Sequence, residues 1–201
     1  MKIGILALLA ILPMLFPPSS RANEPGVVAL VPSHVGLTMT PYPSLCWILV
    51  DKQAVDSAIL FTLLDSRSSE PMLEVKLPSP IQDKRNATCH CINLKDYEIK
   101  LEPNIQYHWY VAVVQSSESP SHDAVSGGLI ELCDFNECLM MFEEIFERCN
   151  KDLVISRAKS GFWYDSISCL CELIKADPQN QKLHRLLDRL MKDVGIIPLK
   201  S

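Results

Sequence analysis

The chain has 201 residues, of which 48% are hydrophobic and 21% charged, and its formal net charge is −5. This composition predicts a globular chain with a sizeable core and argues against intrinsic disorder, which needs low hydrophobicity and high net charge. The acidic excess argues against nucleic acid as a partner, because phosphate binding needs a basic face. Eight cysteines indicate an oxidising compartment, although their spacing leaves the disulfide connectivity open.

Residues 1–22 have the pattern of a secretory signal peptide. Lys2 is followed by a long apolar run, and small residues precede a cleavage site predicted after Ala22. A membrane anchor is the alternative, but a spanning helix needs about 20 apolar residues and Pro13 interrupts this run. We therefore expect an exported mature chain, periplasmic or secreted, that begins at Asn23 and has no membrane span.

The stretch from Leu101 to Gln115 combines a turn with a long strand. Tyr107 and Trp109 fall on one strand face, and Leu101 precedes the tyrosine at the spacing of a tyrosine corner, whose hydroxyl bonds to upstream backbone. Leu101, Tyr107 and Trp109 are therefore predicted to be structural residues. Trp109 stands where antibody-type sandwiches have a cysteine, so Cys46 has no evident partner across the core.

Between Val27 and Cys133, short apolar or β-branched runs alternate with Pro, Ser, Asp and Asn, a pattern typical of strands separated by turns. This predicts that residues 23–133 form a seven-stranded β-sandwich of immunoglobulin-like or fibronectin-III-like type, in a chain that is mainly β with an α tail. Residues 55–64 can also be read as a short helix. The expected strands are 36–40, 45–50, 58–64, 72–77, 88–94, 107–115 and 127–132.

After Cys133 the apolar period changes from two to between three and four, which predicts a small helical region over residues 134–201. A first helix is expected before residue 150, Gly161 breaks the next, and another follows over 162–175. Asp177 and Pro178 are predicted to cap and start a last helix, which Gly195 ends.

Four stretches, at residues 36–43, 101–109, 123–131 and 161–166, occur in the order found in a known family. Together they resemble an exported bacterial family described only as a domain of unknown function, number nine hundred and twenty-eight. The resemblance implies export and this architecture, and it implies no particular reaction.

A second, local resemblance covers the C-terminal helices. Gly161, Tyr164, Asp165 and Ile167, followed by the Ala-Asp-Pro-x-Asn pattern of residues 176–180, are similar to one tetratricopeptide-type helical hairpin. Such repeats expose a groove for partners when they stack, and stable arrays need about three of them. An ordinary helical hairpin packed on the sandwich is the alternative interpretation.

Cys89 and Cys91 are the candidate metal ligands. On a strand their thiols project to one face and His90 projects to the other, so the three residues cannot bind one ion together. Zinc and Cu(I) bind thiolates, but a structural zinc site normally has four ligands. Core thiols or disulfides are the alternative, and no metal or other cofactor is predicted.

Ser121, His122 and Asp123 supply the residue types of a catalytic triad in a row. Consecutive residues point in different directions, and a triad depends on spatial geometry, so we interpret this stretch as a hairpin loop and predict no catalytic residue. Asn86 belongs to a glycosylation sequon, which matters only in a eukaryotic secretory pathway.

Trp163, Tyr164 and Asp165 combine two aromatic rings with a carboxylate at an expected helix start. Such a group can contact a sugar or a partner protein, which makes these residues the candidates for partner binding. The alternative is that Trp163 packs against the sandwich and Asp165 interacts with amides of the first helical turn.

These features favour a non-enzymatic, extracytoplasmic binding or structural module with an envelope protein as its partner, in part by analogy with other modules of this fold. One alternative is a carbohydrate-binding module that uses aromatic residues such as Trp47 and Trp163. The other is an exported thiol- or metal-binding protein that uses Cys89 and Cys91.

Overall fold

The computed structural model describes residues 26–49, 58–78, 89–114, 124–134 and 148–195. The predicted signal peptide, the sequon at Asn86, the row of residues 121–123 and most of the first expected helix lie outside these ranges. The described part of the chain runs through eight strands and then three helices, with a short 3-10 turn, Leu94–Tyr97, after the sixth strand.

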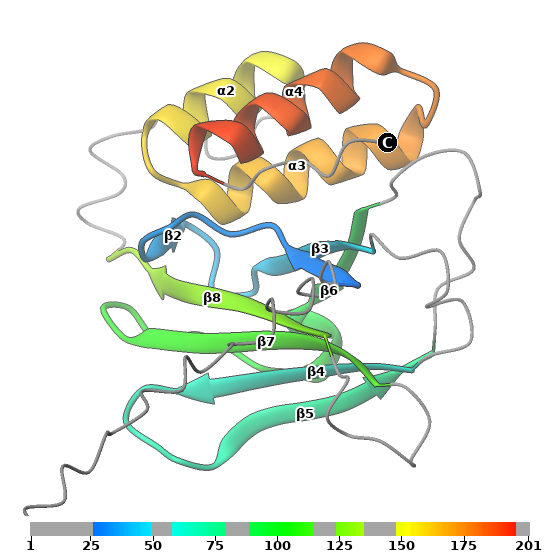
Figure 1. The fold of residues 1–201 in the computed structure, drawn as a ribbon. Helices are drawn as coiled ribbons and strands as arrows, with labels where there is room; N and C mark the ends of the chain where they lie inside the picture. The colour runs from blue at the N-terminus through cyan, green and yellow to red at the C-terminus, as the bar shows by residue number, and fades with distance from the viewer. Residues whose placement is uncertain (1–25, 50–57, 79–88, 115–123, 135–147, 196–201) are drawn as a thin grey trace, which may run out of the picture.

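Two β-sheets make up the N-terminal part of the molecule (Figure 1). The three-stranded sheet has the order β1-β3-β6 and the five-stranded sheet has the order β2-β8-β7-β4-β5. All neighbouring strands are antiparallel except β2 and β8, which are parallel. The strands are β1 (Val27–Ala29), β2 (Gly36–Thr38), β3 (Ser44–Leu49), β4 (Ala58–Asp65), β5 (Pro71–Leu77), β6 (Cys89–Asn93), β7 (Gln106–Val114) and β8 (Ala124–Leu132).

The two sheets share one hydrophobic core because their strands alternate between buried and less buried positions, as the side-chain period of two requires. A column of aromatic rings crosses this core. Trp47 of β3 stacks on Phe61 of β4 at a centroid distance of 6.4 Å, and Phe61 stacks on Trp109 of β7 at 6.0 Å. The sheets therefore face each other through large, well-defined side chains.

The tyrosine corner is present at the start of β7. Leu101, Tyr107 and Trp109 are all completely buried, and the backbone N–H of Glu102 donates a 3.0 Å hydrogen bond to the Tyr107 hydroxyl. The N–H of Leu101 bonds to the carbonyl of Pro41 at 2.9 Å. These bonds fix the turn that precedes β7.

Each of the seven expected strand ranges overlaps a strand, and the structure adds an eighth, β1, that the sequence analysis missed. β1 has only three residues, too few to show an alternating pattern, and it exists because it pairs with β3. Residues 58–65 are a strand and not a helix, since β4 pairs with β5 on one side and with β7 on the other.

Helices α2 (Lys151–Lys159), α3 (Trp163–Ala176) and α4 (Gln181–Asp193) form a layer above the three-stranded sheet in Figure 1. Gly161, with a φ of +86°, separates α2 from α3 as predicted. The predicted start of the last helix is wrong: Asn180, not Asp177, is the N-cap, and its side chain accepts a hydrogen bond from the N–H of Lys182. Asp177 instead ends α3, because its carbonyl accepts the N–H of Asn180 in a tight turn.

The helical layer has its own apolar core. Ile167, Leu170 and Ile174 of α3 pack with an apolar face of α4, and the cluster extends to Leu30 and Cys46 in the three-stranded sheet. The helices are thus held to the sheets by apolar packing, while the tetratricopeptide-type resemblance stays a prediction. No helix in the described ranges is long and apolar enough to cross a membrane.

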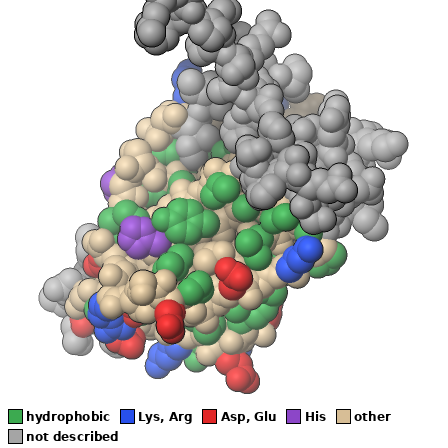
Figure 2. Space-filling model, turned by 60° about the horizontal axis from the view of Figure 1, so that its bottom comes forward, with side chains coloured by type: hydrophobic (Ala, Val, Ile, Leu, Met, Phe, Trp, Pro, Cys, Tyr) green, Lys and Arg blue, Asp and Glu red, His purple; other side chains and the backbone are tan. Residues whose placement is uncertain are grey.

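Figure 2 shows the side of the molecule on which β4 and β5 lie. On its described part, acidic and basic side chains are interspersed with hydrophobic ones, and neither sign of charge dominates. Met72, Tyr110 and Val125 are the large hydrophobic residues that are more than a third exposed among those described. Two pockets lie elsewhere, where α3 meets the sheets.

Candidate functional site

The first turn of α3 docks into the sheets through two buried aromatic residues. The indole N–H of Trp163 donates a 2.9 Å hydrogen bond to the carbonyl of Leu30. The Tyr164 hydroxyl accepts a 2.9 Å bond from the indole N–H of Trp109 and donates one of 2.9 Å to the carbonyl of Leu129. Both rings are therefore used inside the molecule, and the packing alternative weighed for Trp163 describes the structure.

Gly36 at the start of β2 makes room for the Tyr164 ring. A Cβ atom at this position would lie 2.7 Å from a ring carbon of Tyr164, closer than such atoms approach in proteins. The next residue, Leu37, donates its N–H to the carbonyl of Gly161 at 3.3 Å. The approach of α3 to β2 thus depends on a residue without a side chain.

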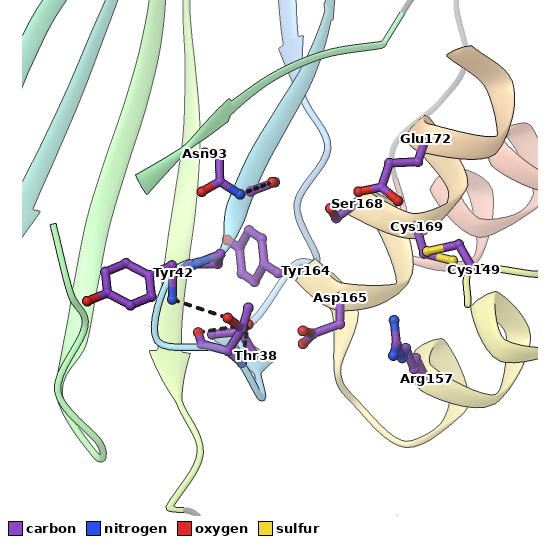
Figure 3. Close-up of a pocket in the computed structure, with 13 residues that line it drawn as sticks. Thr38, Tyr42, Asn93, Cys149, Arg157, Tyr164, Asp165, Ser168, Cys169 and Glu172 are labelled. Atoms are coloured by element: carbon purple, nitrogen blue, oxygen red, sulfur yellow. Dashed lines mark hydrogen bonds between the residues drawn. The ribbon is translucent and has the colours of Figure 1, made fainter. Parts of the chain in front are cut away.

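Asp165 ties the same helix turn to the segment after β2. One of its carboxylate oxygens, Oδ2, accepts the backbone N–H of Met39 at 2.9 Å, and the carboxyl group points toward Thr38 (Figure 3). Burial raises the pKa of Asp165 from 3.8 to about 6, against the opposing effects of the Met39 hydrogen bond and the positive charge of Arg157. This carboxyl group therefore changes its protonation near neutral pH.

A polar pocket of about 150 Å³ opens between α3, α2 and the segment that joins β2 to β3 (Figure 3). One wall is the face of α3 that carries Asp165, Ser168 and Glu172, residues spaced so that they share a side of the helix. We call this cavity the junction pocket. Its remaining walls include Thr38, Thr40, Tyr42, Ser44, Asn93, Arg157, Cys149 and Cys169.

Arg157 is the cation of the junction pocket. Its side chain is 9% exposed, and its Nε–H has no hydrogen-bond partner among the described residues. A buried donor without a partner is unfavourable, by about 1–3 kcal/mol, unless a bound molecule satisfies it. With the hydroxyl of Ser168 and the carboxyl groups of Asp165 and Glu172 on the same wall, this arrangement suits a small polar group.

A larger groove of about 660 Å³ begins beside the junction pocket and shares Ser44, Asn93, Ser168 and Glu172 with it. We call it the β6 groove because it follows β6. The floor includes Trp47, whose indole N–H is buried and has no partner among the described residues. Its other lining residues are Ile59, Leu77, Pro78, Cys89, His90, Cys91, Cys171 and Lys175.

The candidate metal ligands, Cys89 and Cys91, lie at this groove. Cys91 forms a disulfide with Cys46, the residue directly opposite it on β3, whereas Cys89 is a free thiol. Cys46 thus pairs with a neighbouring strand and not across the core, a partner that the sequence analysis missed. The Sγ atom of Cys171 lies within 4.8 Å of both sulfur atoms of this disulfide.

Several side chains of the candidate site carried no signal in the sequence. Arg157 and Glu172 occupy ordinary positions in helical patterns, and nothing in the sequence distinguishes Cys171 from the nearby Cys169. The fold nevertheless places Arg157 in the junction pocket, Cys171 in the β6 groove and Glu172 in both. His90 projects to the opposite face from Cys89 and Cys91, as expected, with its ring 6.4 Å from that of Trp47.

We expect Asp165→Asn to remove a pH dependence of stability. Because the folded-state pKa of about 6 exceeds the unfolded value of 3.8, the folded state holds a proton that the unfolded state has lost, and stability falls as pH rises through this window. Above about pH 6 the loss is complete. Asparagine keeps an oxygen for the Met39 N–H but cannot ionise.

Urea midpoints measured for both proteins between about pH 4 and pH 7 test this. The stability of the wild type relative to Asp165→Asn should fall with rising pH across this range. Asp65 titrates with the opposite sign, since the hydrogen bonds from Arg67 lower its pKa, but its effect cancels in the comparison. A difference that stays constant with pH would contradict the burial of the Asp165 carboxyl.

These observations define a mainly β protein of two facing sheets with a layer of helices. The first turn of α3 joins the helices to the sheets through Trp163, Tyr164 and Asp165. The chain belongs to the family described as Domain of Unknown Function (DUF928), whose model matches residues 17–200. No curated protein is significantly similar to it.

The stretches that carry the family resemblance meet at one place, around Tyr164. This residue lies in the 161–166 stretch, its ring contacts Gly36 of the first stretch, and its hydroxyl bonds to Trp109 and Leu129 of the other two. The shared pattern thus corresponds to the contact between helices and sheets. The shared pattern therefore specifies an architecture. The groups that could bind a ligand lie beside it, in the junction pocket and the β6 groove.

Proposed function

We propose that this protein is an exported, non-enzymatic binding module that takes up an extended segment of an envelope protein along the outer edge of β6. Export is supported by the signal-peptide pattern of residues 1–22 and by the Cys46–Cys91 disulfide, since disulfides persist in oxidising compartments. The strand orders β1-β3-β6 and β2-β8-β7-β4-β5 support an immunoglobulin-like sandwich as the scaffold.

The observation that carries the proposal is the free edge of β6 within a groove. Among the described residues, β6 pairs with β3 on one side and with no strand on the other. An unpaired edge offers a row of backbone donors and acceptors to an added strand, a common mode of peptide recognition. Here that edge is flanked by α3 and by the ends of β4 and β5, which form the walls of the β6 groove.

The register shows which backbone groups face outward. The Cα atoms of Cys46 and Cys91 are 4.1 Å apart, the short spacing of a pair that does not exchange backbone hydrogen bonds. The N–H of Leu94 bonds to the carbonyl of Pro43 at 3.1 Å, which fits the same alternation. The N–H and C=O groups of Cys89, Cys91 and Asn93 therefore point away from β3 toward the open side.

The walls of the groove define the chemistry of the bound segment. On one side α3 presents Glu172 and Lys175, both exposed and of opposite charge, while Ile59 and Leu77 line the other side. Because side chains alternate along a strand, the partner segment should have polar residues toward α3 and apolar residues toward the sheets. Its length should be about five residues, to match β6.

The alternatives weighed from the sequence differ in their support. Trp47 and Trp163 are only 3% and 5% exposed, so neither offers an aromatic platform to a sugar. The hypothesis of a thiol- or metal-binding protein has more support, since Cys89 and Cys171 are free thiols beside the Cys46–Cys91 disulfide. That disulfide already uses two of the sulfur atoms that a metal would need.

Site-specific photo-crosslinking in cells tests the proposal. A photoreactive residue at Lys175, on the groove wall, should capture a defined envelope protein, with the crosslink in an alternating apolar and polar segment. The matched control is Lys192, an exposed lysine on α4 that does not line the groove, and it should capture nothing at the same site. Capture from both positions, or from neither, would contradict the proposal.

Amide hydrogen exchange with a peptide of the captured segment then tests the mode of binding. Added protection is expected at Cys89, Cys91 and Asn93, whose N–H groups face outward, and none at His90 and Ile92, whose groups face β3. Equal protection at all five residues, or none, would place the partner elsewhere than on the strand edge.

A further inference from the structure

Six of the seven described cysteines contact one another in three pairs. The seventh, Cys133, has its partner outside the described residues. Cys46 and Cys91 form a disulfide, and Cys133 is also disulfide-bonded. The other four are free thiols, Cys89, Cys149, Cys169 and Cys171. Their side chains contact each other in two pairs, Cys89 with Cys171 and Cys149 with Cys169.

Helix geometry explains why α3 takes part in both pairs. Cys169 and Cys171 are two residues apart, which places them about 200° apart around the helix axis. Cys171 therefore faces Cys89 of β6, and Cys169 faces Cys149, which lies two residues before α2, as Figure 3 shows for Cys149 and Cys169. For the same reason the two cysteines of α3 cannot bridge each other.

We propose that the oxidised protein contains two further disulfides, Cys89–Cys171 and Cys149–Cys169, which link α3 covalently to the three-stranded sheet and to the start of α2. Each forms when a disulfide donor, such as a protein dithiol oxidant or glutathione disulfide, accepts two electrons. One thiolate attacks the donor and releases its first thiol, and the second thiolate then attacks the mixed disulfide and releases the other. Both cysteines lose a proton and the donor gains two.

The surroundings of these thiols favour pairing over a reactive role. Burial raises the pKa of Cys149, Cys169 and Cys171, so little thiolate is present at neutral pH and their attack on the disulfide donor in the folded protein is slow. Their sulfur atoms are instead held against one another by packed elements. A partner thiol within contact distance is one requirement for a disulfide, which also usually has Cα atoms about 4.4–6.8 Å apart.

The two bonds bear on both cavities. Cys149 and Cys169 line the junction pocket, and Cys89 and Cys171 line the β6 groove. With α3 linked at both positions, the wall that carries Glu172 and Lys175 has a fixed distance from β6. This inference concerns the protein in any oxidising solution, and its test does not depend on the partner or on export.

Peptide mapping without reduction provides a sharp test, because of where trypsin cuts this chain. Cys89 and Cys91 share the peptide 86–95, and Cys169 and Cys171 share the peptide 160–175. Cys46 lies in the peptide that ends at Lys52, and Cys149 lies in 149–151. The proposal therefore predicts one covalent assembly of all four peptides after the purified protein is equilibrated with glutathione disulfide, alkylated and digested.

Variants resolve which cysteine makes each link. Cys171→Ser should split the assembly into two halves, one of 86–95 with the Cys46 peptide and one of 149–151 with 160–175. Cys149→Ser should remove only the peptide 149–151. Ser168→Ala, on the same helix, is the matched control and should leave the assembly intact.

Three results would overturn the proposal. The first is that only the Cys46 peptide and 86–95 remain linked in the oxidised wild type. The second is a link that survives Cys171→Ser through another cysteine. The third is zinc or copper that purifies with the protein and protects these thiols until a chelator removes it, which would make the cluster a metal site. The wild-type map alone decides the first, so the test does not depend on a variant that folds.

Discussion

Trp109→Ala is expected to lower the free energy of unfolding by about 3–5 kcal/mol, a large part of the stability of an ordinary domain. The Trp109 ring is completely buried, stacks on Phe61 and lies edge-on to Tyr164 at 6.4 Å. Its indole N–H also donates to the Tyr164 hydroxyl. Alanine would leave a cavity between the sheets and loosen the turn of α3 that docks there.

Two control substitutions on β7 separate the loss of the buried Trp109 ring from the loss of an exposed ring and from the loss of a single hydrogen bond. Tyr110→Ala removes an aromatic ring that is 41% exposed on the other face of the strand, and it should cost about 1 kcal/mol or less. Tyr107→Phe removes only the bond from the Glu102 N–H and should cost about 1–2 kcal/mol. Denaturant midpoints give all three values, and a wild-type midpoint for Trp109→Ala would contradict a core at this position.

Replacing both Cys46 and Cys91 with alanine should cost about 4 kcal/mol in the chain-entropy account of a crosslink that closes a 45-residue loop. Both residues are changed together, because a single substitution would leave a thiol free to exchange with Cys171, which lies within 4.8 Å. The unfolded chain gains conformations when the crosslink is removed. The native strand pairing of β3 with β6 stays possible.

Denaturation curves of both proteins under oxidising and reducing conditions separate the contribution of the crosslink to stability from the contribution of side-chain packing. The wild type should lose stability when a reductant is added, and the double variant should lose less, since one crosslink is already absent. Cys46 is almost fully buried, so part of the cost in the variant comes from its lost sulfur contacts. Equal sensitivity of the two proteins to the reductant would show that the Cys46–Cys91 bond contributes nothing.

The elements of this fold could largely be predicted because their signals are local. The period of two in residues 107–113 identifies a strand with one buried face, and Gly161 marks the break between two helices. The wrong start assigned to α4 has a local cause as well. Asp177 and Asn180 are both good caps, and only the turn that joins them decides which one begins the helix.

The candidate site could not be predicted to the same extent, because its contacts join distant parts of the chain. The Asp165 bond to Met39 spans 126 residues and the Trp109 bond to Tyr164 spans 55. The sequence allowed two interpretations of the 163–165 stretch, a partner surface or packing of Trp163 against the sandwich. Whether such rings face solvent or core depends on what the helix packs against.

The sequence by itself determined seven of the eight described β-strands, the tyrosine corner and the family, since each depends on residue types at fixed, short spacings. Only the tertiary structure decided which cysteines meet, that Arg157 lies beside Asp165, and that no strand in the described part of the chain pairs with the second edge of β6. Pairing depends on register, and a shift of one residue between β3 and β6 would turn Cys91 away from Cys46 to the other face. Register is set by the packing of whole sheets, to which every strand contributes, and no single stretch of the chain encodes it.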